Sequence, residues 1–293
     1  MLKMTPEKLA IAFKSACMAE LEALKPGNVH LFADGHGMTI TDFIKSADAT
    51  ALVIAQPNLS VGERILHAVQ ATQNAVGLNT NLGIILLCAP LIHAALQVKV
   101  DSIDINQALL EQLQYTLHSS TIDDAWSVSQ AIVLANPAGL GQVSQYDVRN
   151  QADVTLLQMM QAAEHQDRIA WQYAHDFSDI IEFGLMRYQE AMKKWQHFNN
   201  KGQNQAWATT ALYLSFLSRQ CDTHVIRKHD VALATTVMLE AREMAASFWA
   251  EENPKLVQKQ LLTWDASLKK RNINPGTSAD LTVATLLLSY LVN

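Results

Sequence analysis

Charged residues are scarce in this sequence, at 17% of its 293 residues, whereas hydrophobic residues make up 49%. Such a composition excludes a disordered chain and indicates a thick, buried interior. A long basic stripe is also missing, and 22 Lys and Arg against 28 Asp and Glu give a formal net charge of -6. Because nucleic-acid binding depends on clustered positive charge, we expect no nucleic-acid partner.

Cysteine is also rare, and the three residues are far apart without C-x-x-C spacing: Cys17, Cys88 and Cys221. This argues against a zinc site or a disulfide framework and predicts a cytoplasmic protein in a reducing environment. The N-terminal residues lack the apolar segment of a signal peptide. The strongest membrane candidate, Leu82 to Leu96, is too short to span a bilayer and contains Pro90 and His93, so we expect no membrane association.

Strand-like alternation is almost absent, and apolar residues recur at helical spacing along the chain. The sequence therefore predicts an all-α fold, with a single large multi-helix domain over residues 1–293. So apolar a composition also leaves room for a further buried helix surface and a homo-oligomer. After a first helix that begins at Pro6 and a core helix over 82–96, the expected helices include 103–117, 122–134, 154–174, 177–198, 205–217, 230–250, 254–271 and 278–292.

A polar turn over 77–83, Gly-Leu-Asn-Thr-Asn-Leu-Gly, leads directly into the most apolar run of the chain. Free backbone N–H groups and a partial positive charge at such a helix start suit an anionic ligand. The alternative is an ordinary cap, because Asn and Thr are preferred there. A second ambiguous start is Thr121-Ile122-Asp123-Asp124, in which Asp123 and Asp124 are either caps or Mg²⁺ ligands.

Three further polar segments adjoin apolar helices. Lys25-Pro26-Gly27-Asn28-Val29-His30 forms a Pro-Gly loop, and residues 221–229 place an acid, a hydroxyl and four potential cations in one connection. Residues 271–281 combine a Pro-Gly turn with Ser278 and Asp280. The spacing of Thr277 and Asp280 also fits a capping box, which is a purely structural alternative.

These motifs together resemble the triphosphoribosyl-dephospho-CoA synthase family from about residue 9 to the C-terminus. The resemblance implies a single all-α domain that transfers the triphosphoribosyl group of ATP to the ribose 2′-hydroxyl of dephospho-CoA and releases adenine. The motifs that carry it are Lys25-Pro26-Gly27, Asn79-Thr80 with Gly83, Asp222-Thr223 with Arg227, and Asn274-Pro275-Gly276-x-Ser278-Ala279-Asp280-Leu281.

Through this resemblance, ATP and dephospho-CoA or another cofactor precursor are the expected small-molecule substrates, with Mg²⁺ accompanying ATP. Asp222 or Asp280 is expected to orient the metal or accept the hydroxyl proton. Arg149 and Arg168 are secondary candidates. The expected substrate-binding residues are Lys25, Pro26, Gly27, Asn28, His30, Asn79, Thr80, Asn81, Gly83, Thr223, Arg227 and Ser278, of which Lys25 and Arg227 would contact phosphate.

The chain departs from the family pattern at Asn81 and Leu82, where a His and a Lys are typical. The loop from Pro26 to His30 resembles a family branch of archaea and one-carbon-metabolising bacteria. One alternative is therefore a related transfer or condensation in the biosynthesis of a methanopterin- or methanofuran-type one-carbon cofactor. Another is a noncatalytic helical protein that binds a nucleotide.

Overall fold

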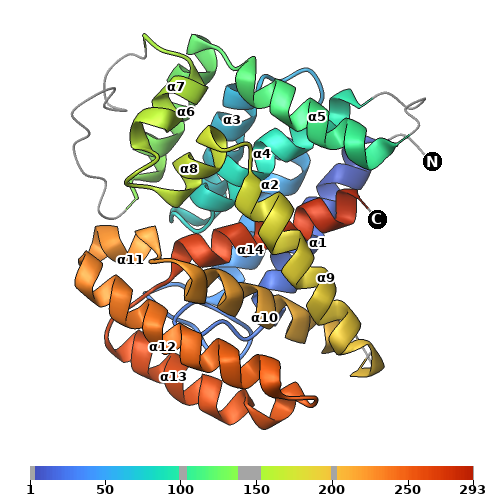
Figure 1. Ribbon diagram of the computed structural model, residues 1–293. Helices are drawn as coiled ribbons and strands as arrows, with labels where there is room; N and C mark the ends of the chain where they lie inside the picture. The colour runs from blue at the N-terminus through green and yellow to red at the C-terminus, as the bar shows by residue number, and fades with distance from the viewer. Residues whose placement is uncertain (1–3, 99–103, 138–152, 199–202, 293) are drawn as a thin grey trace. The chain divides into compact units, whose positions relative to one another are not determined.

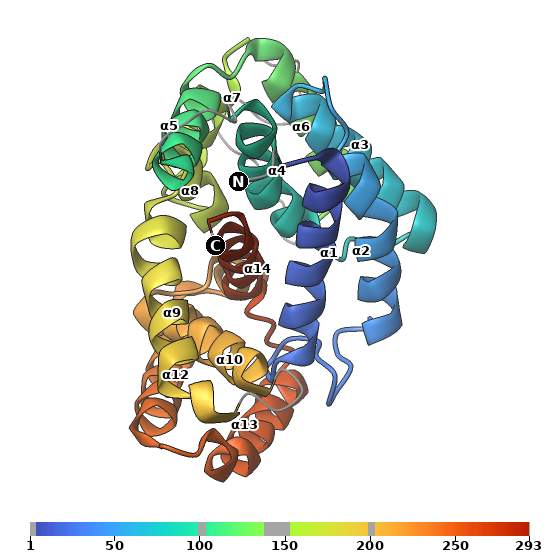
Figure 2. The same cartoon turned by 90° about the vertical axis from the view of Figure 1, so that its right-hand side faces the viewer.

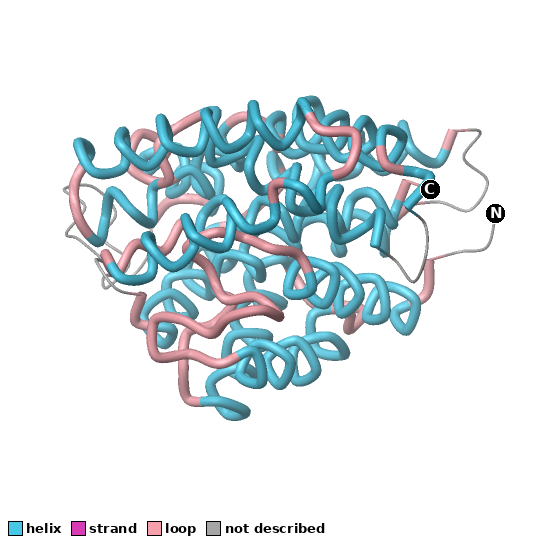
Figure 3. Tube along the Cα trace, turned by 90° about the horizontal axis from the view of Figure 1, so that it is seen from below, coloured by secondary structure: helices cyan, strands magenta, loops and turns pink. Residues whose placement is uncertain are grey.

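The computed structural model describes residues 4–98, 104–137, 153–198 and 203–292. Within these ranges the chain consists of helices and connecting loops, without a β-strand (Figure 3). The loop that follows the first helix contains two isolated β-bridges, which pair His30 with Ala33 and Gly35 with Met38. The predicted all-α fold is confirmed.

The helices divide into two compact units, each built from segments that are distant in sequence. Unit 1 comprises Met1–Ser15, Asp42–Ser178 and Leu287–Asn293, and unit 2 comprises Ala16–Thr41 and Asp179–Leu286. Helices α1 (Pro6–Glu22) and α14 (Gly276–Leu291) contribute residues to both. The expectation of one domain over residues 1–293 stays a prediction.

Unit 1 packs its helices around α3 and α4. Helix α3 lies beside α6 and α4, and α4 also contacts α5 and α8 (Figures 1 and 2). Besides the start of α1, the helices of this unit are α2 (Ile40–Ile54), α3 (Val61–Val76), α4 (Leu82–Gln97), α5 (Ile105–His118), α6 (Ile122–Ala135), α7 (Leu156–Ala163) and α8 (Arg168–Ala174).

Helix α4 is the predicted core helix, and Pro90 interrupts its hydrogen bonding. Proline has no N–H, so the carbonyl of Leu86, four residues earlier, loses its usual donor within the helix. The Tyr173 hydroxyl donates to that carbonyl at 2.5 Å. Burial raises the pKa of Tyr173, so the phenol keeps the proton that it donates. A side chain of α8 thus satisfies the backbone group that Pro90 leaves without a partner.

The starts of α3 and α6 lie against each other at Gly62. A Cβ atom on Gly62 would lie 2.4 Å from Asp124 Cα, so only glycine permits this approach. The Gly62 N–H donates to Asp124 Oδ1 at 2.7 Å. The spacing Ser60-x-x-Glu63 predicts a capping box, and the structure has it, because each side chain bonds the backbone N–H of the other residue.

Unit 2 is centred on α10, which packs against both α9 and α12 (Figure 2). Glu240 of α12 accepts hydrogen bonds from Trp264 and Arg271 and thereby ties α12 to the α13 region. Besides parts of α1 and α14, this unit contains η1 (Asp179–Gly184), α9 (Leu185–Lys194), η2 (Gln196–Phe198), α10 (Gln203–Arg219), α11 (Thr223–Lys228), α12 (Val231–Ala250), η3 (Pro254–Leu256) and α13 (Gln258–Lys270).

Three expected helices are divided in the structure, and the one over 254–271 consists of the 3-10 turn η3 and α13. The helix predicted over 154–174 is split into α7 and α8, because Asp167 caps a new helix by accepting from the Ile169 N–H at 2.7 Å. The helix predicted over 177–198 consists of a π-helix, α9 and a 3-10 turn. Among the described residues, no helix is both long and apolar enough to cross a membrane.

Candidate functional site

The structure brings three of the four predicted polar segments together in unit 2. The loop after α1 meets the connection between α13 and α14, and the start of α11 meets the start of α14. The fourth segment, the turn at Asn79, belongs to unit 1.

Lys25 is fully buried in an ion pair with Glu20. Its ammonium group also donates to the Val29 carbonyl at 2.8 Å and lies 3.4 Å from Asn28 Oδ1. Burial lowers the pKa of Lys25, and the Glu20 carboxylate opposes this effect. Burial likewise raises the pKa of Glu20, and Lys25 opposes it. The positive charge of Lys25 is thus enclosed and compensated by Glu20. The expected role of Lys25 in phosphate binding stays a prediction.

Asp265 on α13 holds the loop that contains Gly27. Its Oδ1 accepts from the Gly27 N–H at 2.8 Å, and its Oδ2 accepts from Lys269 Nζ at 3.1 Å. Lys269 also donates to the Ala33 carbonyl at 3.1 Å. Asp265 and Lys269 are one helical turn apart on α13, so together they fix the loop at two points. Neither residue stands out in the sequence, because each fits an ordinary helix face.

His30 is buried beside Asp265. Its Nδ1 accepts from the Phe32 N–H at 3.2 Å, which places the proton of the neutral ring on Nε2. Nε2 lies 3.3 Å from Asp265 Oδ1, but it has no hydrogen bond of acceptable geometry within the described residues. Burial lowers the pKa of His30. Burial raises the pKa of Asp265, but His30, the Gly27 N–H and Lys269 outweigh it, so this pKa lies below its ordinary value.

Gly27 and Asn28 join the loop to the connection before α14. Gly27 has φ +86°, and an added Cβ would lie 2.8 Å from Pro275 Cδ, so both the conformation and the space require glycine. Asn28 Nδ2 donates to Asn274 Oδ1 at 2.8 Å. The Pro26 carbonyl accepts from the buried Tyr213 hydroxyl at 2.7 Å. The Lys25 loop and the Asn274 segment are therefore in direct contact.

Asp222 joins the start of α11 to the start of α14. Its Oδ1 accepts from the His224 and Val225 N–H groups at 2.9 and 3.2 Å. Its Oδ2 accepts from the Ser278 N–H at 2.7 Å and from Ser278 Oγ at 2.8 Å. The side chain is buried. All four lone-pair directions of the carboxylate are therefore engaged by the protein.

The remaining expected residues of unit 2 surround this junction. Thr223 Oγ1 lies 3.0 Å from Thr277 Oγ1, and Thr277 Oγ1 also accepts from the His224 N–H at 3.1 Å. Helix α14 begins at Gly276, one residue before the predicted cap at Thr277, because Asp222 supplies the cap from another helix. Arg227 and Asp280 are both partly exposed.

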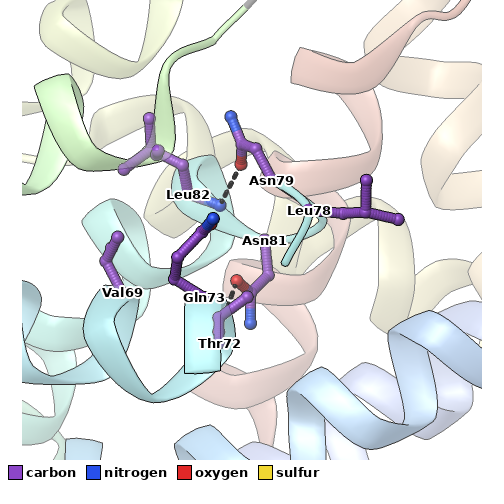
Figure 4. Close-up of a pocket in the computed structure, with 8 residues that line it drawn as sticks. Val69, Thr72, Gln73, Leu78, Asn79, Asn81 and Leu82 are labelled. Carbon is purple, nitrogen blue, oxygen red and sulfur yellow. Dashed lines mark hydrogen bonds between the residues drawn. The ribbon is translucent and has the colours of Figure 1, made fainter. Parts of the chain in front are cut away.

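The Asn79 turn follows α3, which ends with Gly77 in the left-handed conformation at φ 66°. Asn79 Oδ1 accepts from the Leu82 N–H at 3.2 Å and so supplies the first turn of α4 with an acceptor (Figure 4). Asn79 lies two residues before the N-cap residue Asn81, whose own side chain makes no cap hydrogen bond, so Asn79 satisfies the first N–H of α4 in its place. The shallow pocket beside it has space for about one water molecule.

Asn81 is buried in a hydrogen-bonded group with two threonines. Its Oδ1 accepts from Thr72 Oγ1 at 2.9 Å (Figure 4), and its Nδ2 donates to Thr50 Oγ1 at 3.2 Å. The two threonine hydroxyls are 2.9 Å apart. Thr80 Oγ1 lies 2.5 Å from Ser46 Oγ. These bonds tie α2, α3 and α4 together. Gly83 is the second residue of α4 and is partly exposed.

Asp124 is engaged as a helix cap. Its Oδ2 accepts from the N–H and hydroxyl groups of Thr121 at 2.9 and 2.8 Å, in addition to the bond from Gly62. Burial raises the pKa of Asp124, but hydrogen bonds from Gly62, Ser60 and Thr121 outweigh it, so the pKa lies below its ordinary value. Of the two readings for Asp123 and Asp124, this geometry favours the cap. The magnesium role has no support from it.

Metal-ligating residues do not gather elsewhere in the described part of the chain. No group of three or more His, Cys, Asp or Glu side chains there is arranged to hold a metal ion. Within the described residues, no Mg²⁺ site made of three or more such side chains is therefore found. Of the two secondary candidates, Arg149 lies outside the described residues, and the guanidinium of Arg168 stacks 3.4 Å from the Trp171 ring centre.

Residues 6–293 match the sequence model of the family described as ATP:dephospho-CoA triphosphoribosyl transferase. A search of curated proteins finds no match. Among solved structures, the fold is similar to that of a candidate triphosphoribosyl-dephospho-CoA synthase from Archaeoglobus fulgidus, with a TM-score of 0.62 and 22% identity over 87% of this chain and 99% of that chain. At this level of identity the likeness concerns the fold alone.

Proposed function

Because the chain belongs to the ATP:dephospho-CoA triphosphoribosyl transferase family, we propose that its unit 2 junction around Asp222 and Asp280 serves the transfer of the triphosphoribosyl group. The family match makes the protein a transferase that moves this group from ATP to dephospho-CoA in cofactor biosynthesis. The match over residues 6–293 is the observation that carries this function. It favours this function over a one-carbon-cofactor reaction or a noncatalytic nucleotide-binding role.

The reaction exchanges one bond at the anomeric carbon of the ATP ribose. The bond from this carbon to adenine breaks, and a bond to the acceptor hydroxyl oxygen forms. The hydroxyl loses a proton to a base, and the departing adenine gains one. A positively charged, oxocarbenium-like state is expected between the two bonds. The protein therefore needs a carboxylate near the acceptor hydroxyl and cationic groups near the triphosphate.

Asp280 is the better candidate for the base of the two expected carboxylates. Asp222 is buried, and its oxygens accept hydrogen bonds from His224, Val225 and Ser278. A carboxylate held in this way is suited to positioning α11 and α14. Asp280 lies in the first turns of α14, is partly exposed, and acts electrostatically on Lys25. We assign the proton transfer to Asp280 and the positioning role to Asp222.

Several finer features belong to the same proposal. Mg²⁺ is proposed to arrive bound to ATP, since magnesium ions in proteins commonly keep water molecules and substrate phosphates as ligands. None of the proton or bond changes described for the transfer depends on Mg²⁺. A cytoplasmic location is proposed because ATP is a substrate and the three cysteines are free. A homo-oligomer and a role in one-carbon metabolism stay predictions.

The transfer itself is tested with the full chain, ATP, Mg²⁺ and dephospho-CoA. Adenine and a triphosphoribosylated acceptor are expected in equal amounts, measured by chromatography and mass spectrometry. A reaction without dephospho-CoA is the control for ATP breakdown alone. Absence of adenine from protein that circular dichroism shows to be folded would contradict the proposal. ATP that binds but persists would favour the nucleotide-binding role.

If Asn79 contacts ATP, as the family resemblance implies, Asn79→Ala should weaken ATP binding more than it weakens folding. The variant removes one cap bond, at 3.2 Å to the Leu82 N–H, whose loss typically costs about 0.5–2 kcal/mol. ATP affinity by calorimetry and Tm by circular dichroism measure the two effects. Asn79→Ser is the matched control for the cap, because its hydroxyl can still accept from a backbone N–H. A lowered Tm with unchanged ATP affinity would leave Asn79 a cap only.

A further inference from the structure

Three basic side chains of unit 2 converge on Asn272, in the connection between α13 and α14. Lys228 Nζ donates to Asn272 Oδ1 at 3.0 Å, and His36 Nδ1 lies 3.3 Å from the same oxygen. His229 Nε2 lies 3.1 Å from the Asn272 carbonyl oxygen. Asn272 is exposed and has φ 58°. We call His36, Lys228, His229 and Asn272 the Asn272 cluster; its members come from three segments of the chain.

The basic groups of the Asn272 cluster have no acidic partner in the described part of the chain, since none of them forms an ion pair there. Lys228 has three N–H donors and uses one of them on Asn272. His36 faces oxygen acceptors at both ring nitrogens, because its Nε2 also lies 2.8 Å from the Gly27 carbonyl oxygen.

The surroundings of the cluster add positive charge. Burial lowers the pKa of His224; Asp222 opposes this, while Arg227, Lys228 and His36 lower it further. These cations therefore act on one small region beside the start of α14. The nearby acid Asp222 is buried and engaged by four hydrogen bonds. The basic side chains of this region, His36, Arg227, Lys228 and His229, outnumber the acids that solvent reaches, Asp230 and Asp280. This excess favours an anionic ligand.

We infer that the Asn272 cluster binds the triphosphate group of the donor substrate, an inference that rests on the proposed function for its choice of ligand. A triphosphate carries several negative charges and presents oxygen acceptors that suit Lys and His donors. Lys25, the residue expected to contact phosphate, is enclosed with Glu20. Lys228 and His36 are partly exposed and form no ion pair within the described residues, and His36 Nε2 lies 2.8 Å from the Gly27 carbonyl oxygen. The triphosphate is thereby placed on residues that the sequence did not single out as ligands.

The test is a calorimetric titration of inorganic tripolyphosphate into the full chain and its variants at low salt. Lys228→Ala is expected to weaken binding about tenfold, as for loss of one charge-assisted hydrogen bond. His36→Gln is expected to weaken binding several-fold, and Lys228→Arg to retain most of the affinity. Lys259→Ala, an exposed lysine on α13, is the matched control for net charge and should bind like the unchanged protein.

The inference would be overturned if the unchanged protein did not bind tripolyphosphate, or if folded Lys228→Ala bound it equally well. Equal losses in Lys228→Ala and Lys259→Ala would also overturn it, because they would show a response to net charge alone. Failure of the proposed function is separate. Tripolyphosphate binding through Lys228 without release of adenine from ATP would reject the transfer and keep the site. If Lys228→Ala still catalysed the transfer with an unchanged KM for ATP, the triphosphate site would be rejected and the transfer function kept.

Discussion

Asp280→Asn is expected to lower kcat for adenine release by about 10²–10⁴-fold, the usual contribution of a general base. Asparagine has nearly the same shape but cannot accept the hydroxyl proton. Because the base acts in the transition state, KM for both substrates should change much less than kcat. Initial rates of adenine formation over a range of ATP and dephospho-CoA concentrations measure the two parameters. Tm should change little, since Asp280 is only partly buried.

Two variants decide what a loss of activity in Asp280→Asn means. Asp222→Asn should lower Tm and activity together, because an amide nitrogen cannot accept the bonds that Asp222 now receives from Ser278 or from α11. Asp48→Asn changes a partly exposed carboxylate paired with Lys14 in unit 1 and should leave the rate unchanged. Asp280→Asn with an unchanged kcat would remove Asp280 from the mechanism.

Lys25→Met is expected to destabilise the protein by about 3–5 kcal/mol, the usual effect of breaking a buried ion pair from one side. Methionine fills a similar volume, but the Glu20 carboxylate loses its partner, and the Val29 carbonyl and Asn28 amide lose a donor. Urea unfolding followed by circular dichroism measures the change in free energy. The double variant Glu20→Gln, Lys25→Met should recover part of the loss, because it removes the unpaired charge.

The destabilisation of Lys25→Met should depend on pH in a defined direction. Burial already raises the pKa of Glu20, and Lys25 opposes this. Without Lys25, the folded-state pKa of Glu20 rises further above its unfolded value. Such a group favours folding when protonated, and this contribution is lost as pH rises through the folded-state pKa. The variant should therefore lose less stability near pH 5 than near pH 8. A loss that is the same at both values would contradict the assigned cause.

The Lys25 variant also separates a structural role from a ligand role. If Lys25 acts only through its pair with Glu20, folded Lys25→Met should bind tripolyphosphate like the unchanged protein. If Lys25 contacts phosphate as the family resemblance implies, the affinity should fall although the protein remains folded. The measurement is best made near pH 5–6, where the variant is expected to be least destabilised.

Much of the local structure follows from short sequence patterns. Ser60 with Glu63 and Thr121 with Asp124 mark the starts of α3 and α6, because a capping box involves residues three positions apart. The continuous apolar run after Asn81 predicted a buried helix, and α4 is one. The predicted helix ends were less accurate where an additional N-cap residue divides a predicted helix, as Asp167 does. Local spacing carries this information since the interacting groups are near each other in the chain.

The sequence by itself determined the all-α fold, the family and the polar segments near Gly27, Asp222 and Ser278. Only the tertiary structure decided what these side chains touch. It enclosed Lys25 with Glu20, engaged Asp222 with Ser278, and brought His36 and Lys228 to Asn272. The last two contacts join residues 44 or more positions apart. Burial and long-range hydrogen bonds therefore distinguish a charged side chain held inside the protein from one available to a ligand. Local sequence spacing specifies neither burial nor long-range bonding, so the sequence alone could not make this distinction.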